Sequence, residues 1–374
     1  MKFETKAIHL GHEVDPLTGA IAAPLHLSTT FEREADGSYP RGHIYSRLSN
    51  PNRDALERSL AGLENGEGAI AFASGLAAIT NVFQALLPGD HVIASQDLYH
   101  GTTHILQDIF EPWGLEVSFI DVTDTSQLEG AIQPNTKMIF LETPSNPLLK
   151  ITDIAAVADI AHKAGALCVC DNTWATPLLQ RPLDLGADIV VHSTTKYFGG
   201  HSDVLGGATI SKVKDAFFDR MRMLQQIGGA VPAPFDCWLV LRGIQTLSCR
   251  MKNQSESAFA IAKFLQKHPH VEKVYYPGLV DHPGHDIVLK QMSQFGGMLS
   301  FQIKGNKEEA LAFTGRLKII RRATSLGGVE SLIEHRASIE GPNSKTPDNL
   351  LRFSVGLENL DDLLTDLDTA LTHK

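Results

Sequence analysis

The strongest constraint on the fold is an alternation of apolar, strand-like runs with helical patterns, which begins near residue 51. Helical patterns such as 154–165 separate several of these runs. Strands that are buried on both faces and joined by crossover helices form a mostly parallel sheet. The sequence therefore predicts an α/β fold with a mostly parallel, seven-stranded sheet. The expected strands are 68–73, 91–95, 116–120, 137–142, 167–170, 188–192 and 207–210.

The pattern changes beyond Pro232 to long helices such as 237–267, followed by strands near 297–303 and 351–355. A single hydrophobic core stops growing at roughly 250–300 residues, so a chain of 374 residues predicts two domains. Residues 1–50 lack a periodic pattern but carry many apolar and aromatic side chains, which predicts an arm that packs on another surface, such as a second subunit. The expected organisation is an arm over 1–50, a large domain over 51–235 and a small α+β domain over 236–374.

Composition excludes several classes of partner and compartment. The formal net charge is −10 and no basic run stands out, which argues against nucleic acid or an acidic membrane surface as a partner. No apolar stretch approaches 18 residues and the N-terminus leads into no apolar run, so we expect a cytoplasmic protein without a membrane span. None of the four cysteines has zinc-site spacing, and no metal is expected.

Small polar and charged residues follow four of the expected strands. In open parallel sheets, ligands bind at the carboxyl ends of the strands. These four strand ends therefore predict one ligand site that holds an Asp and a Lys at the same sheet edge. The segments are Ser74-Gly75-Leu76, 143–147, Asp171-Asn172-Thr173 and 193–196.

Lys196 comes just after a buried strand and follows Ser193 and Thr195. A lysine in that place loses part of its hydration, which lowers its pKa and allows it to form a Schiff base. The alternative is a solvated lysine at a strand end. Hydroxyl groups, together with the helix N-terminus expected at Gly75-Leu76, are suited to binding a phosphate.

Asp171 follows the apolar run 167–170, where a carboxylate needs a positive partner to be buried. The pyridinium nitrogen of pyridoxal phosphate is such a partner, and its protonation makes the ring an electron sink. An Asx turn or a helix cap is the alternative role for Asp171 taken alone. Fingerprints for a dinucleotide, a P-loop nucleotide and a zinc protease are absent from the sequence. Asp171 and Lys196 together therefore predict a pyridoxal-phosphate site.

The segment DIVVHSTTKYFGGHS at 188–202 resembles the lysine signature of the cysteine/methionine-metabolism (trans-sulfuration) family of pyridoxal-phosphate enzymes. This family includes cystathionine γ-synthases, cystathionine β- and γ-lyases, methionine γ-lyases and homoserine-ester sulfhydrylases. The resemblance covers about residues 5–370 and implies the aspartate-aminotransferase-like fold. It also rests on YSRLSNP at 45–51, SGLAA at 74–78, ETPSNP at 142–147, SLGGVES at 325–331 and RFSVGLE at 352–358.

The resemblance implies a role for each matching position. Lys196 would hold the cofactor and move protons, Asp171 would pair with the ring nitrogen, and Tyr99 would stack on the ring. Arg352 would bind the substrate carboxylate with help from Asn146 and Ser325, and Glu330 would face a distal amino group. The family is usually a homotetramer built as a dimer of dimers. The remaining cofactor contacts implied are Gly75, Leu76, Thr173, Ser193 and Thr195, with Tyr45 and Arg47 from a neighbouring subunit.

The reaction expected from the resemblance is carbon–sulfur cleavage of L-cystathionine or a related amino acid, with Cγ–S cleavage favoured over Cβ–S cleavage. Tyr99 is the natural proton donor to the leaving thiolate. The alternatives are a γ-replacement enzyme that joins cysteine or sulfide to an activated homoserine, and a non-catalytic binding protein with the same fold. The chain departs from the patterns of known members at Ile44, His100, Gly101, His104, Trp174 and 334–336, and carries Leu326 where several β-lyases have an aromatic residue.

Overall fold

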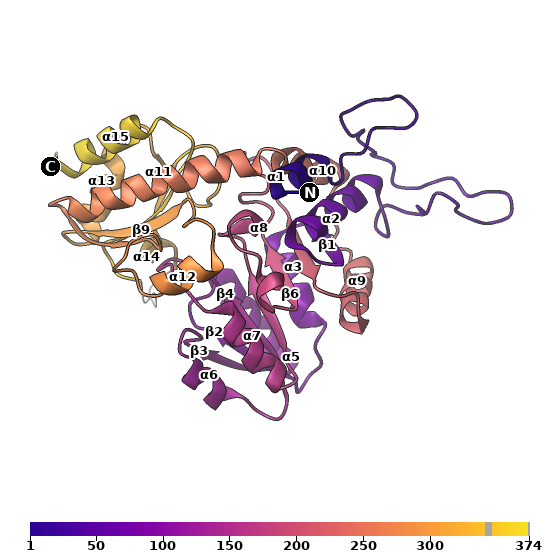
Figure 1. The fold of residues 1–374 in the computed structure, drawn as a ribbon. Coiled ribbons are helices and arrows are strands. Elements are labelled where there is room, and N and C mark those ends of the chain that lie inside the picture. Colours follow the sequence, from indigo (N-terminus) through magenta and orange to yellow (C-terminus); the bar gives the residue numbers. More distant parts are fainter. Residues whose placement is uncertain (341–345, 373–374) are drawn as a thin grey trace.

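The computed structural model describes residues 1–340 and 346–372 and contains two β-sheets with helices packed around them (Figure 1). The large sheet has seven strands in the order β1-β7-β6-β5-β4-β2-β3, and β7 alone runs antiparallel to its neighbours. The expected mostly parallel sheet is therefore confirmed. Its strands are β1 (Gly68–Phe72), β2 (His91–Ser95), β3 (Glu116–Ile120), β4 (Thr136–Glu142), β5 (Leu167–Asp171), β6 (Ile189–His192) and β7 (Gly207–Ser211).

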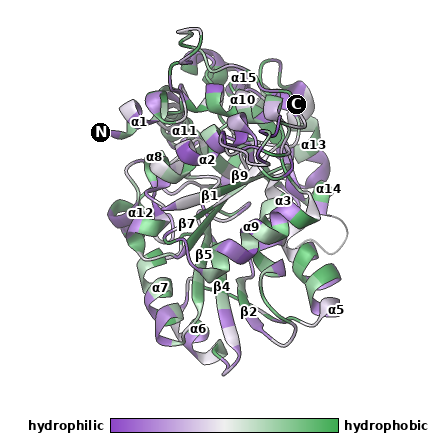
Figure 2. Cartoon of the chain, turned by 90° about the vertical axis from the view of Figure 1, so that its right-hand side faces the viewer, coloured by the Kyte–Doolittle hydropathy of each residue, from purple (hydrophilic) through white to green (hydrophobic). Residues whose placement is uncertain are grey.

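Both faces of this sheet are covered by helices. Along β4, Met138 and Phe140 pack into a core with Phe83 of α3 (Gly75–Gln84). Ile139 and Leu141 pack into the opposite core, which contains Val157 of α7 (Ile154–Lys163). This alternation explains the continuous apolar runs of the sequence, because each strand buries side chains on both sides. Figure 2 shows the apolar strands between the more polar outer surfaces of the helices.

Several helices around the large sheet begin at N-termini capped by a side chain, and α2 and α3 are two of them. Asn50 Oδ1 accepts a hydrogen bond of 2.9 Å from Asn52 N at the start of α2 (Pro51–Glu64), where Pro51 takes the first helical position. Ser74 Oγ accepts one of 3.1 Å from Ala77 N at the start of α3. The other helical segments of this part are α1 (Phe3–His9), α4 (His100–His104), a π-helix (Ile105–Phe110), α5 (Glu111–Trp113), α6 (Thr125–Ala131), α8 (Thr176–Leu179), a 3₁₀-helix (Pro182–Leu185) and α9 (Ala216–Gly228).

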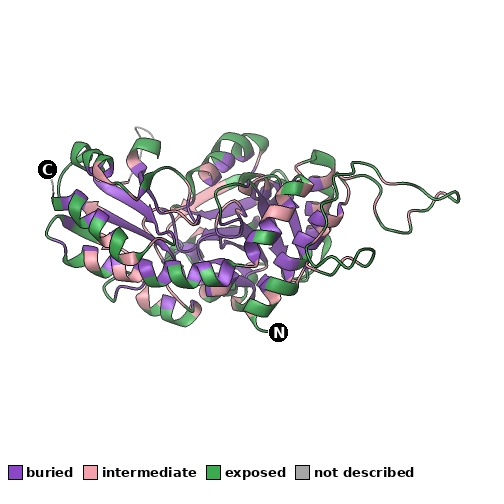
Figure 3. Ribbon diagram, turned by 90° about the horizontal axis from the view of Figure 1, so that it is seen from above, coloured by how far each residue is buried: buried purple, intermediate pink, exposed green. Residues whose placement is uncertain are grey.

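The second sheet has five strands in the order β10-β11-β12-β9-β8. Its buried side chains, among them Phe301 and Phe353, pack with helix residues such as Phe313 and Leu367 into a separate core. Figure 3 shows this buried layer beneath helices with exposed outer faces. The elements are α11 (Leu247–Lys267), β8 (Val271–Tyr275), α12 (His285–Gln291), β9 (Met298–Ile303), α13 (Lys307–Arg316), β10 (Arg321–Arg322), β11 (Leu332–His335), α14 (Arg336–Glu340), β12 (Leu350–Ser354) and α15 (Leu360–Thr372).

The single helix expected at 237–267 is wrong, because the structure has two helices there, α10 (Pro234–Ile244) and α11. The carbonyl of Gly243 accepts hydrogen bonds from Thr246 N, Thr246 Oγ1 and Arg250 Nη2 instead of continuing the helix. Gly243 also lies against the backbone of Phe198 and Gly199, where a side chain would clash. The break between α10 and α11 therefore lies where Gly243 packs closely on the loop that contains Lys196.

Within the predicted arm, α1 packs against α2 and α11, and the residues between α1 and α2 extend away from the body of the molecule (Figures 1 and 3). Leu17, Ile21 and Leu27 are exposed on this extension, and an isolated bridge joins Thr30 to Tyr45. The domain limits at 50 and 235 stay predictions. Within the described part of the chain, no helix combines the length and apolarity that crossing a bilayer requires.

Candidate active site

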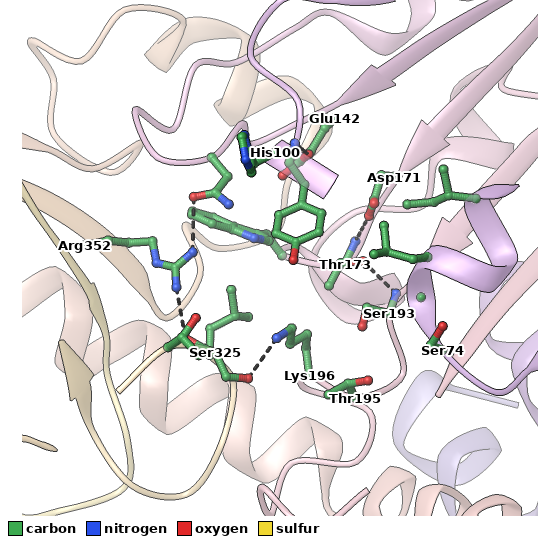
Figure 4. Close-up of a pocket in the computed structure, with 18 of the residues that line it drawn as sticks. Ser74, His100, Glu142, Asp171, Thr173, Ser193, Thr195, Lys196, Ser325 and Arg352 are labelled. Atoms are coloured by element: carbon green, nitrogen blue, oxygen red, sulfur yellow. Dashed lines mark hydrogen bonds between the residues drawn. The ribbon is translucent and has the colours of Figure 1, made fainter. Parts of the chain in front are cut away.

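A cavity of about 370 Å³ lies at the carboxyl ends of β4, β5 and β6, where residues of β12, of α14 and of the segment 324–326 close it. Most of the residues predicted at the strand ends line this cavity, including Gly75, Asp171 and Lys196. Figure 4 shows Lys196, Asp171 and Arg352 pointing into the same space from different elements. Tyr99, Asn146, Thr173, Ser193, Thr195, Ser325, Arg352 and Leu76 also line it.

Lys196 follows β6 through a turn and points its amine into the cavity. Its Nζ donates a hydrogen bond of 2.8 Å to Ser325 Oγ. Burial lowers the pKa of Lys196 to about 8, and the nearby Arg352 acts in the same direction. A substantial fraction of the amine is therefore neutral near physiological pH, which is the form that attacks an aldehyde or accepts a proton.

Asp171 ends β5 and is buried, with Oδ1 accepting a hydrogen bond of 3.0 Å from Thr173 N. Burial raises its pKa, while the hydrogen bonds from Thr173 oppose that change. Glu142 of β4 lies directly opposite Asp171 and is buried too, and burial and then Asp171 raise the pKa of Glu142 well above its ordinary value. A cation placed against Asp171 would relieve the cost of burying this charge.

The N-terminus of α3 and the turn before Lys196 form a small cradle. A Cβ atom at Gly75 would meet Ser193 Cβ at 2.8 Å and Ser193 Oγ at 2.9 Å, so glycine keeps this space open. Ser193 N donates to Thr173 Oγ1 at 2.9 Å, and Thr195 Oγ1 accepts from Gly206 N at 3.0 Å, which fixes the turn. The first N–H groups of a helix lack helical partners and attract anions, so this cradle fits a phosphate.

Arg352 projects from β12 into the opposite side of the cavity and is buried. Its Nη1 donates to Asn146 Oδ1 and its Nη2 to the Ser325 carbonyl, both at 3.2 Å. Nη2 also lies 2.7 Å from Glu334 Oε2, on the neighbouring strand β11. Burial lowers the pKa of Arg352 to about 10, and Glu334 opposes that shift, so the guanidinium remains charged at neutral pH.

Three predicted residues lie outside this cavity. Tyr45 and Arg47 belong to the arm, where Arg47 Nη1 donates to the Gln226 carbonyl at 2.7 Å. Glu330 accepts a hydrogen bond from Ser202 Oγ and does not line the cavity. Its contact with a distal amino group therefore stays a prediction.

Glu142, Glu334 and Arg336 were not assigned roles by the sequence, yet they lie in or beside the cavity. The sequence does contain an indication for Glu142, because this residue ends an apolar strand as Asp171 does. Glu334 and Arg336 belong to a segment that departs from the family pattern, but their contacts depend on β11 pairing with β12.

A buried lysine whose pKa is lowered to about 8, a buried aspartate and an anion cradle lie together at one edge of an α/β sheet. This arrangement is typical of a pyridoxal-phosphate enzyme. The residues fit that group, since Asp171 faces the cavity and the cradle at Gly75 is open. The chain belongs to the Cys/Met metabolism PLP-dependent enzyme family, whose model matches residues 4–372. The predicted family, cofactor and fold are confirmed.

Relatives carry three different activity names. Cystathionine γ-synthase of Mycobacterium tuberculosis is 46% identical over 98% of this chain and 96% of its own length. Cystathionine β-lyase of Coxiella burnetii is 44% identical over 98% of this chain and 97% of its own. Cystathionine γ-lyase of Bacillus subtilis is 45% identical over the full length of both. The sequence identities of this chain to the synthase and to the two lyases differ by only one or two percentage points, so they do not separate a lyase from a synthase.

Solved structures show the same fold. The structure of metB from Corynebacterium glutamicum superposes with a TM-score of 0.96 at 43% identity, covering 99% of this chain and 98% of that one. Cystathionine γ-lyase from Lactobacillus plantarum, complexed with L-serine, gives a TM-score of 0.95 at 43% identity with the same coverage.

Proposed function

We propose that this chain is a carbon–sulfur lyase that cleaves L-cystathionine, with the Cγ–S bond broken in preference to the Cβ–S bond. The observation that carries the proposal is the convergence of Lys196, Tyr99 and Arg352 on one cavity. These side chains supply a base, a phenol and a carboxylate receptor for an amino-acid substrate. Pyridoxal phosphate, when bound, would supply the electron sink that stabilises negative charge at the substrate carbon.

Each residue has a defined task in this proposal. Arg352 binds the substrate carboxylate through its guanidinium, which Asn146 and the Ser325 carbonyl hold in place. Lys196, with a pKa of about 8, takes a proton from the substrate carbon and can return it. Tyr99 is half-exposed in the cavity and can donate a proton to the leaving sulfur.

Charge balance in the cavity lining favours cystathionine over an acylated homoserine with an extra carboxylate. Arg336, a further cation of the lining, is already paired with Glu334 at 2.9 Å and Glu340 at 3.0 Å. The donor atoms Nη1, Nη2 and Nε of its guanidinium are therefore already engaged by carboxylates of the chain before any ligand arrives. The distal end of cystathionine is a zwitterion without net charge, whereas a succinyl group would bring an unmatched negative charge.

The second candidate is γ-replacement, in which cysteine or sulfide displaces the activated group of a homoserine ester. Relatives named cystathionine γ-synthase, at 46% identity, favour it. It uses the same cofactor and the same carboxylate receptor.

Self-association completes the proposed site. The arm carries exposed apolar side chains and places Tyr45 and Arg47 outside the cavity of their own chain. We infer that they reach the cofactor phosphate of a neighbouring subunit and that the enzyme is a homotetramer formed by two such dimers.

The test is to incubate the cofactor-loaded enzyme with L-cystathionine and to identify the keto acid by chromatography. We expect 2-oxobutyrate, the product of Cγ–S cleavage. Pyruvate as the main product would overturn the preference for the γ-bond. No keto acid, but cystathionine formed from a homoserine ester and cysteine, would overturn the lyase and support γ-replacement.

A further inference from the structure

Four side chains of alternating charge form a chain of ion pairs beside the carboxylate receptor. Glu334 Oε2 lies 2.7 Å from Arg352 Nη2 and 2.9 Å from Arg336 Nη1, so one oxygen bridges two guanidinium groups. Glu340 Oε1 then lies 3.0 Å from Arg336 Nη2 and accepts from Arg336 Nε at 3.1 Å. We call this series the Arg–Glu chain.

Glu334 creates a problem for the proposed role of Arg352. Burial alone would raise the pKa of Glu334, but Arg352 and Arg336 hold it below its ordinary value, so the side chain is ionised at neutral pH. It therefore presents to Arg352 the same chemical group as the substrate. An ion pair of Arg352 with Glu334 alone would be neutral and would have little attraction left for a second carboxylate.

Arg336 changes that balance. It contributes a second positive charge to the oxygen of Glu334 that faces Arg352. Glu340 contacts the other edge of the Arg336 guanidinium, through Nε and Nη2, and so lies one residue further along the chain from Arg352. Arg336 is also as buried as Arg352, so water screens its charge only weakly.

We propose that Arg336 is a positioning residue: it holds Glu334 and offsets its charge, so that Arg352 stays available to the substrate carboxylate. This rests on the role of Arg352 given under the proposed function. The local backbone supports a fixed placement, because His335 is anchored on both ring nitrogens, at 2.6 Å to the Asp348 carbonyl and at 2.7 Å to Ser338 Oγ. Arg336 begins α14 directly after this anchor.

The experiment measures equilibrium binding rather than turnover. L-Serine is titrated into the cofactor-loaded enzyme, and the change in visible absorbance gives an apparent Kd. Serinamide, which has the same amine and hydroxyl but no carboxylate, is the matched ligand. We expect Arg336→Met to raise the Kd of L-serine about tenfold or more, as for the loss of one partner from a buried charge pair, and to leave serinamide within about twofold.

The decisive variant is the double substitution Arg336→Met with Glu334→Gln. We expect it to bring the Kd of L-serine back to within about threefold of wild type, because no charge then competes for Arg352. Arg336→Lys, which keeps the charge, should also stay within about threefold, and Glu334→Gln alone should bind L-serine at least as tightly as wild type. These two variants keep the proposal testable if Arg336→Met does not fold.

An unchanged Kd in Arg336→Met, a loss that Glu334→Gln does not repair, or weaker L-serine binding by Glu334→Gln alone would each overturn the proposal. A purely structural role for Arg336 would weaken both ligands or lower cofactor loading. Arg352→Met tests the receptor role of Arg352 separately from the positioning role of Arg336. If Arg352→Met binds L-serine as wild type does, the receptor role of Arg352 fails, whatever Arg336→Met shows.

Discussion

Glu142 and Asp171 lie directly opposite each other at the ends of the adjacent parallel strands β4 and β5, and both carboxyl groups are buried. Two negative charges at this separation would repel strongly in a medium that screens them poorly. Burial raises the pKa of both groups, but the neighbouring Asp171 raises that of Glu142 as well, whereas two hydrogen bonds from Thr173 and the nearby His192 oppose the rise at Asp171. We therefore expect Glu142 to be the member that keeps its proton. We propose that Asp171 is the carboxylate that pairs with the cofactor ring.

Glu142→Gln should therefore change the pH dependence of stability. A carboxyl whose folded pKa lies above its unfolded value stabilises the protein below the unfolded pKa, and this stabilisation is lost as pH rises through the folded pKa. Glutamine does not titrate, so the variant does not lose stability in this way as pH rises. Its amide oxygen can still accept the hydrogen bond from Tyr99 N. We expect the variant to gain stability over wild type as pH rises above about 4.5, by at most about 1.4 kcal/mol per pH unit.

Denaturant unfolding of the cofactor-free protein between pH 4 and pH 8 measures this difference. Glu129→Gln on the exposed face of α6 is the control and should show no such trend. A constant difference between Glu142→Gln and wild type, or one that falls with pH, would mean that Glu142 is ionised.

Asp171→Asn should remove the charge that we propose keeps the ring nitrogen protonated, while preserving the shape of the side chain. We expect kcat to fall by about 100-fold or more, which corresponds to about 2.7 kcal/mol of transition-state stabilisation. Steady-state kinetics with saturating cofactor check this. Asp159→Asn, in an exposed pair with Lys163, is the matched control and should keep its rate. Equal rates for Asp171→Asn and wild type would remove Asp171 from the cofactor site.

Gly75→Ala should weaken the hold on the cofactor phosphate, because the new Cβ would press on Ser193 at less than 3 Å. We expect the cofactor Kd to rise about tenfold or more, since a displaced anion loses charge-assisted hydrogen bonds. Fluorescence titration of the cofactor-free protein measures it. Gly130→Ala in α6 places its Cβ in open space and should bind normally. Normal cofactor affinity in Gly75→Ala would place the phosphate elsewhere.

Arg47→Ala and Lys196→Ala should each be inactive alone but should complement each other when their subunits are mixed. If Arg47 acts on the neighbouring subunit, half of the randomly assembled dimers are hybrids with one intact site of two, which predicts about a quarter of wild-type activity. Mixing after mild dissociation, followed by a keto-acid assay, measures the recovery. No recovery, despite hybrids seen by native mass spectrometry, would contradict action between subunits.

Local pattern was sufficient to predict the large sheet and that residues at its strand ends, such as Asp171 and Lys196, lie together in one cavity. The strands around Phe140 and Val169 are continuous apolar runs, and Lys196 and Asp171 are found where two of them end. Because parallel strands finish at one edge, these ends could be placed together without knowing the rest of the fold.

The opposite wall of the cavity could not be derived in the same way. Asn146 contacts Arg352 across 206 positions, and only the docking of the second sheet brings them together. The pairing of Glu334 with Arg352 depends on the register of β11 and β12, which a one-residue shift would change. Glu330 bonds to Ser202, and nothing in its local sequence distinguishes that contact from one with substrate.

The most direct test of Lys196 as the residue that binds the cofactor covalently is a mass measurement. The cofactor-loaded enzyme is reduced with borohydride and digested, and the added mass is located by tandem mass spectrometry. We expect the cofactor on the peptide that contains Lys196, attached at its amine, and no covalent label in Lys196→Ala. A label on another lysine, or an active wild-type enzyme with Lys196 unmodified, would contradict the assignment of this side chain as the cofactor anchor.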